Sequence, residues 1–114
     1  MEDNADAADA LRTALEYEGH EVEVAFTGRE GVEKARAFRP DFVYCDIGLP
    51  EMNGFEVATA IRADPQLAGM MLIALTGYAA PEDVAKSKQA GFDEHLAKPP
   101  SLASISIIMK EKRR

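Results

Sequence analysis

The chain has 114 residues, of which 46% are hydrophobic and 29% are charged, a balance typical of one globular domain. Its net charge of −7 argues against non-specific binding to nucleic acid or anionic membranes, because both need a basic surface. The single cysteine, Cys45, excludes an intramolecular disulfide and a cysteine-based zinc site. The N-terminus is acidic and no apolar run approaches the roughly 18 residues of a membrane span, so we expect a cytoplasmic protein.

The first 40 residues predict two helices with a strand between them. In residues 5–18, apolar side chains recur every three or four positions, which is typical of an amphipathic helix. Residues 21–26 alternate between polar and apolar, which predicts a half-buried strand. Thr27 is a suitable N-cap for a second helix that ends at Phe38.

The rest of the chain alternates short apolar runs with helical patterns of about ten residues. The predicted strands are residues 42–45, 70–75 and 95–97, and the predicted helices are residues 54–63 and 81–90. Strands that alternate with such helices form βαβ units, so we expect an α/β fold with a parallel sheet covered on both faces. Ligands of such sheets bind at the carboxyl ends of the strands.

Polar residues stand at those strand ends. Asp46, Thr76 and Lys98 each follow a predicted strand, and Glu2 and Asp3 precede the first helix. Each has an ordinary structural explanation alone: a cap or turn for the aspartate, a turn for the threonine, a solvated lysine, and acidic residues that favour a helix N-terminus. The predicted sheet, however, gathers all of them at one edge.

The gathered groups suit phosphoryl chemistry. Close carboxylates repel one another unless a cation neutralises them, and Mg²⁺ prefers oxygen ligands. Lys98 adds a positive charge and Thr76 a hydroxyl donor, both suited to phosphoryl oxygens. A carboxylate nucleophile beside Mg²⁺ and a lysine predicts formation of an acyl phosphate.

The segment 46–54, with sequence DIGLPEMNG, resembles the phosphoacceptor loop of two-component response regulator receiver domains. Three further segments resemble the same family in order and spacing, namely residues 2–4, 75–77 and 91–99. The resemblance extends to about residue 105. It implies a flavodoxin-like, doubly wound sheet with strand order 2-1-3-4-5, and a signalling switch that catalyses only its own phosphorylation and dephosphorylation rather than a conventional enzyme.

The resemblance also implies roles for individual residues. Asp46 is the expected phosphoacceptor for a sensor histidine kinase or a histidine phosphotransfer protein. Mg²⁺ is expected on the side chains of Asp3 and Asp46, on the backbone carbonyl of Gly48, and through water on Glu2. A homodimer, with or without domain swapping, is one arrangement that the resemblance leaves open.

Four more residues take positions with family roles. Thr76 is expected to move towards the phosphoryl group and Lys98 to pair with it. The bond between Lys98 and Pro99 is expected to be cis. His95 stands where the family carries a switching aromatic residue, although it reads equally well as a half-exposed strand histidine.

The chain departs from the family at its start, because only Met1 precedes the acidic pair where a strand of about five residues is usual. The C-terminal segment 101–114 therefore has two interpretations. It reads as the expected fifth helix, or residues 104–109 form a strand that fills the vacant place, either in their own chain or in a second chain by domain swapping.

The sequence also allows functions other than a phosphorylated switch. A non-phosphorylatable pseudo-receiver would use the surface around residues 78–90 and His95 as an interaction module. An aspartyl phosphohydrolase needs a second acid where Gly48 stands, and a flavin-binding domain needs a phosphate loop where residues 2–4 stand, so both are disfavoured.

Overall fold

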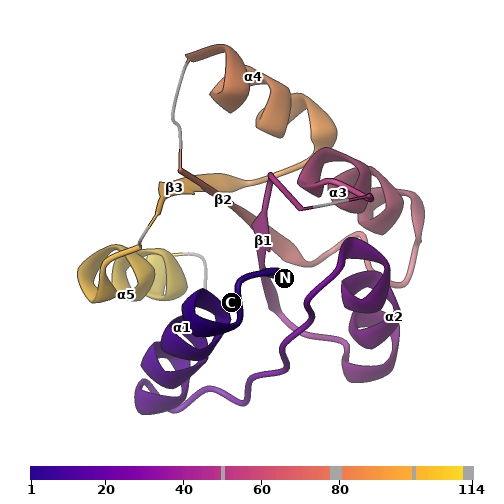
Figure 1. The fold of residues 1–114 in the computed structure, drawn as a ribbon. Coiled ribbons are helices and arrows are strands. Elements are labelled where there is room, and N and C mark those ends of the chain that lie inside the picture. The colour runs from indigo at the N-terminus through magenta and orange to yellow at the C-terminus, as the bar shows by residue number, and fades with distance from the viewer. Residues whose placement is uncertain (50, 78–80, 99, 112–114) are drawn as a thin grey trace.

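The computed structural model describes residues 1–49, 51–77, 81–98 and 100–111 and forms a parallel sheet enclosed by helices (Figure 1). The helices are α1 (Ala5–Tyr17), α2 (Gly28–Phe38), α3 (Gly54–Ala63), α4 (Pro81–Ala90) and α5 (Leu102–Glu111). The strands are β1 (Phe42–Asp46), β2 (Met71–Thr76) and β3 (Glu94–Ala97). The α/β class predicted from the alternating patterns is confirmed.

The three strands pair in parallel in the order β1-β2-β3. Phe42 lies opposite Met71, and Ile73 lies opposite Glu94, so the carboxyl ends of all three strands meet at one edge. Strand β2 is central and nearly all of its residues are buried. This burial on both faces explains why β2 is a continuous apolar run rather than an alternating one.

Side chains of successive strand residues point to opposite faces of the sheet and belong to two separate hydrophobic cores. Val43, Cys45, Leu72 and Ala74 point to one face, where they pack with apolar residues of α2 and α3. On the other face, Tyr44, Ile73 and Leu75 pack with Leu15 of α1 and with Ile105, Ile108 and Met109 of α5. In Figure 1, α1 and α5 accordingly lie together on one side of the sheet and α2 and α3 on the other.

Helix starts agree closely with the sequence because their signals are local. Asn4, Thr27 and Asn53 each accept a hydrogen bond from a backbone N–H of the first helical turn. Asn53 and Glu56 form a reciprocal capping box at the start of α3. These caps fix where the chain turns from loop to helix after each strand or extended segment.

The strand predicted at residues 21–26 is wrong, because no strand forms there. The backbone of Met1 and Glu2 lies between this segment and β1. It makes one backbone hydrogen bond to the segment, from Glu2 N to Ala25 O at 2.9 Å. A strand needs a row of such bonds, so the segment stays extended without becoming part of the sheet.

The C-terminal segment is helical, since α5 spans Leu102–Glu111 and its Ile105 is fully buried against the sheet of its own chain. A replacement strand at residues 104–109 is therefore absent from this structure. In the part of the chain that the structure describes, no helix combines the length and the apolar character needed to cross a membrane.

Candidate functional site

The carboxyl edge of the sheet brings together the polar residues that the sequence singles out. Asp46 is the last residue of β1, Thr76 is the last residue of β2, and Lys98 follows β3 directly. The parallel register places these three positions on neighbouring strands, and the Lys98 backbone N–H donates to the Thr76 carbonyl at 2.8 Å. Asp46 and Thr76 are both buried.

Lys98 joins two carboxylates. Its Nζ lies 2.5 Å from Asp46 Oδ2 and 2.5 Å from Glu2 Oε1. The other oxygen of Asp46, Oδ1, accepts the backbone N–H of Gly48 at 2.9 Å. Both oxygens of Asp46 are thus oriented by donors from two different loops, and the carboxylate has a fixed position at the edge.

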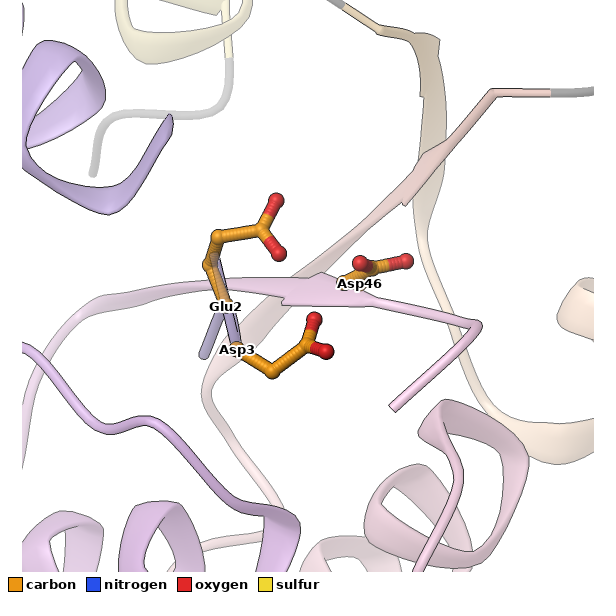
Figure 2. Close-up of side chains that lie close together, drawn as sticks. All are labelled: Glu2, Asp3 and Asp46. Atoms are coloured by element: carbon orange, nitrogen blue, oxygen red, sulfur yellow. The ribbon is translucent and has the colours of Figure 1, made fainter. Parts of the chain in front are cut away.

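Glu2 and Asp3 complete an acidic cluster with Asp46. One carboxylate oxygen from each of the three residues lies within 4.8 Å of the others, and Figure 2 shows the side chains converging. Glu2 is buried, whereas Asp3 is exposed. Three carboxylates with one open side form the oxygen-rich donor set that a hard divalent cation such as Mg²⁺ prefers.

The backbone at the chain start positions Glu2. The Met1 carbonyl accepts the Asp46 N–H at 2.9 Å, and the Met1 ammonium donates to the Tyr44 carbonyl at 2.5 Å. Together with the bond from Glu2 N to Ala25 O, these contacts hold Met1 and Glu2 between β1 and the extended segment. The residue pattern does not predict these backbone contacts, because periodicity reports side-chain burial and not hydrogen bonds of the backbone.

The charges of the site shift the pKa values of its groups. Burial alone would raise the pKa of Asp46, but the hydrogen bonds from Lys98 and Gly48 outweigh it and the pKa is lowered. Burial raises the pKa of Glu2 despite the opposing contact with Lys98. Burial alone would lower the pKa of Lys98, but its bonds to Asp46 and Glu2 raise it. Asp46 is therefore an ionised carboxylate beside an ammonium group at neutral pH.

The N–H of Gly48 donates to Asp46, a contact that the sequence does not predict, and the expected metal contact of the Gly48 carbonyl stays a prediction. His95 lies in β3 with intermediate exposure, and its buried Nε2 has no hydrogen-bond partner among the described residues. Pro99 and its peptide bond, like Tyr78, lie outside the described residues.

Comparison with known proteins finds matches in sequence and in structure. The family model described as the response regulator receiver domain matches residues 1–110. The polar-differentiation response regulator DivK of Brucella anthropi is 33% identical over 102 residues, which cover 90% of this chain and 83% of that protein.

Two solved structures have the same fold. One is the signal receiver domain of a signal transduction histidine kinase from Syntrophus aciditrophicus, with a TM-score of 0.88 and 30% identity over 100% of this chain and 90% of that one. The other is the receiver domain of a sensor histidine kinase from Pseudomonas aeruginosa PAO1, with a TM-score of 0.89 and 30% identity over 97% of this chain and 91% of that one. The second structure is described with a magnesium ion coordinated in its active-site cleft.

Proposed function

The chain belongs to the response regulator receiver domain family, and from this premise we propose that it is a phosphorylation-activated signalling switch whose phosphoacceptor is Asp46. The observation that carries the proposal is the geometry at Asp46. Its ionised carboxylate ends a buried strand, is held by Lys98 and Gly48, and lies beside the acidic pair Glu2 and Asp3.

The proposed reaction is a phosphoryl transfer to oxygen. A carboxylate oxygen of Asp46 forms a bond to the phosphorus of the donor, while the bond from phosphorus to the donor's leaving group breaks and its electron pair leaves with that group. The product is an acyl phosphate. Hydrolysis of the acyl phosphate resets the switch. Water attacks the phosphorus, the bond to the carboxylate oxygen breaks, and inorganic phosphate leaves.

Lys98 and Thr76 take separate tasks in this proposal. Lys98 Nζ contacts Asp46 Oδ2 before transfer and is placed to pair with a phosphoryl oxygen afterwards. Thr76 stands on the adjacent strand at the same edge, where its hydroxyl is suited to a second phosphoryl oxygen. His95 is the proposed reporter of this change on β3, and the Lys98–Pro99 bond is the proposed cis peptide.

The residues present fit a magnesium ion. Glu2, Asp3 and Asp46 offer three carboxylates within 4.8 Å, and hard oxygen donors are what this ion requires. We propose that these residues and the Gly48 carbonyl hold it. When bound, Mg²⁺ would neutralise the charge that accumulates on the transferred phosphoryl oxygens.

The proposed phosphodonor is a sensor histidine kinase or a histidine phosphotransfer protein. Two solved structures with the same fold are receiver domains of histidine kinases, which supports a phosphohistidine donor of this kind. Cytoplasmic phosphotransfer is part of the same proposal.

Intact mass after incubation with a small-molecule phosphodonor tests the function. We expect one phosphoryl adduct of about 80 Da, the mass of one PO₃ group, on the chain in the presence of Mg²⁺. We expect no adduct when the metal is chelated or when Asp46→Asn replaces the nucleophile. Asp41→Asn is the matched control, because Asp41 lies just before the same strand and is exposed.

Absence of the adduct in a sample with native circular dichroism would contradict the proposal and favour the interaction-module alternative. An adduct that persists in the Asp46→Asn variant would place the phosphoryl group elsewhere and contradict the assignment of Asp46.

A further inference from the structure

Arg62 and Asp93 form an ion pair at the amino edge of the sheet, the edge opposite the acidic cluster. Arg62 lies near the end of α3, and Asp93 directly precedes β3. Arg62 Nη2 lies 2.7 Å from Asp93 Oδ2, and the two side chains are 25% and 35% exposed. Asp93 stands five positions before Lys98, so roughly 16 Å of extended chain separates the pair from the candidate site.

The Arg62 guanidinium group joins the two segments that lead into β2 and β3. Its Nη1 donates to the Ala68 carbonyl at 2.6 Å and to the Met70 carbonyl at 2.7 Å, just before β2 begins. Its Nε donates to the Gly91 carbonyl at 2.9 Å, in the turn between α4 and β3. The planar fork of arginine makes these bonds and the ion pair at the same time, which the three donors of a lysine ammonium group cannot do.

Asp93 connects these segments to one particular residue of β2. Its backbone N–H donates to the Leu72 carbonyl at 2.8 Å, and its Oδ2 accepts the Leu72 N–H at 2.8 Å. The same Oδ2 accepts the hydrogen bond from Arg62. Asp93 therefore pairs with both backbone groups of Leu72, and these bonds define which residue of β2 lies beside the start of β3.

The register of β3 depends on such end contacts more than the register of β2 does. Strand β3 has four residues, none of them fully buried, and it pairs with β2 alone among the described strands. Burial specifies the register of a strand strongly only where one face of that strand is buried. The neighbouring Phe92 is buried, but apolar burial is non-directional and does not select one backbone partner.

The ion pair joins two elements that both extend to the carboxyl edge of the sheet. Strand β3 leads to Lys98, whose Nζ contacts Asp46 Oδ2 at 2.5 Å. Helix α3 begins at Gly54, whose N–H donates at 3.0 Å to the carbonyl of Ile47, the residue after Asp46. A slip of β3 along β2 by one residue would move Lys98 by about 3.3 Å and break its contact with Asp46.

We propose that Arg62 and Asp93 are positioning residues for phosphoryl transfer: by fixing the register of β3 on β2 at the amino edge, they place Lys98 Nζ beside the Asp46 carboxylate at the carboxyl edge. The inference rests on the proposed function of Asp46, and it gives a part in that function to two residues that lie outside the acidic cluster. A displacement of about 1 Å, produced far from the reacting atoms, can slow a reaction about 10²-fold.

Hydrogen exchange at the carboxyl edge tests the positioning role without metal or phosphodonor. The Lys98 amide donates to the Thr76 carbonyl and reports on β3, whereas the Ile47 amide donates to the Leu75 carbonyl and reports on β1 and β2. In Asp93→Ala, we expect exchange of the Lys98 amide to accelerate at least about tenfold more than exchange of the Ile47 amide, because β3 no longer keeps one register. Unchanged exchange at Lys98, or equal acceleration of both amides, overturns the proposal.

Arg62→Lys tests the pair at the level of the reaction. Lysine keeps the charge but cannot make all the bonds of the guanidinium group, so we expect phosphorylation of Asp46 in the presence of Mg²⁺ to slow about tenfold. Arg36→Lys is the matched control, because Arg36 forms a 3.3 Å ion pair with Asp64, which lies outside β3. Circular dichroism checks that both variants are folded. The parent rate in Arg62→Lys, or equal slowing of both variants, would contradict the proposal.

A double-mutant cycle shows whether the pair acts through Lys98. Asp93→Ala is combined with Lys98→Gln, and initial phosphorylation rates by intact mass are divided by the folded fraction of each variant. We expect the double variant to react within about twofold of the rate of Lys98→Gln alone, because a misplaced residue that is already absent costs nothing further. Slowing that multiplies would indicate a general structural effect and overturn the proposal. If the parent chain takes up no phosphoryl group, the proposed function fails, whereas exchange at Lys98 still decides whether Asp93 positions that residue.

Discussion

Lys98 is 2.5 Å from a carboxylate oxygen of Asp46 and equally close to one of Glu2, so it offsets the repulsion between the two acids. Without its charge, the pKa of Asp46 should rise, because the bond that lowers it is gone. For Lys98→Gln we therefore expect phosphorylation of Asp46 to slow on the order of 10²-fold, as for loss of one donor to a developing charge. Initial rates of adduct formation by intact mass measure this effect.

Lys110→Gln serves as the matched control for that prediction. Lys110 is an exposed lysine near the end of α5 and contacts neither acid. An equal decrease in rate for both variants would indicate a general effect of net charge and would contradict the specific role of Lys98.

Cys45 gives the folded chain a distinct response to alkaline pH. Burial raises the pKa of its thiol from 9.0 to about 12, so the folded state keeps the proton that the unfolded state releases above pH 9. Since the folded state binds more protons in this range, the free energy of unfolding falls as pH rises from 9 towards 12. We expect urea titrations to give a steeper decrease between pH 9 and 10.5 for the parent chain than for Cys45→Ala.

One such group changes the free energy of unfolding by at most about 1.4 kcal/mol per pH unit. Tyr44, whose pKa burial raises to about 12, is present in both chains and contributes equally to each. Identical slopes for the parent and the Cys45→Ala variant would show that the thiol is not protected, and alkylation of the folded chain by iodoacetamide would then also be fast.

At the scale of elements, Gly54 sets how closely α3 approaches the end of β1. A Cβ at this position would lie 2.6 Å from Ile47 Cα and 2.8 Å from the Asp46 carbonyl oxygen, and neither backbone atom can move easily. We expect Gly54→Ala to lower the free energy of unfolding by about 1–3 kcal/mol through overpacking, despite the better helix propensity of alanine. Chemical denaturation measures the change.

Gly69 provides the control, because a Cβ there meets nothing within 4 Å. Gly69→Ala is expected to leave stability within about 0.5 kcal/mol of the parent, as for an exposed position. A Gly54→Ala variant as stable as the Gly69→Ala variant would mean that the loop after β1 yields to the added methyl group.

The elements that the sequence predicts well are those whose signals are local. Thr27 and Asn53 cap their helices within a few residues of where the pattern changes, and the buried runs of β1 and β2 identify themselves by composition. The segment 21–26 alternates like a strand, yet its hydrogen bonds depend on a neighbour that only Met1 and Glu2 supply. Alternation reports which side chains face the core and carries no information on whether a partner strand exists.

The candidate site follows the same division. Asp46 and Thr76 end parallel strands and Lys98 directly follows the third, so the three lie at one edge of the sheet, as the predicted topology requires. Loop geometry determines the contact from the Gly48 N–H to Asp46 and the position of the Met1 ammonium. The periodicity of the sequence carries no information on loop geometry. The sequence therefore predicts which side chains lie together, but not which backbone N–H groups donate hydrogen bonds to them.

At the scale of the whole molecule, the two hydrophobic cores differ in size. Among the described residues, the core beneath α2 and α3 contains thirteen buried residues, whereas the core beneath α1 and α5 contains seven. Burial of apolar area is the main stabilising contribution in folding, so stability should concentrate around β2, which both cores share. The side formed by α1 and the extended segment 21–25 is expected to open first.

Hydrogen exchange of backbone amides tests this distribution. The amides of Ile73 and Leu75 lie in the central strand and should exchange only on global unfolding, whereas those of Glu23 and Ala25 lie in an extended segment outside the sheet and should exchange roughly 10³-fold faster or more. Uniform protection across both segments would contradict a molecule whose stability is centred on β2.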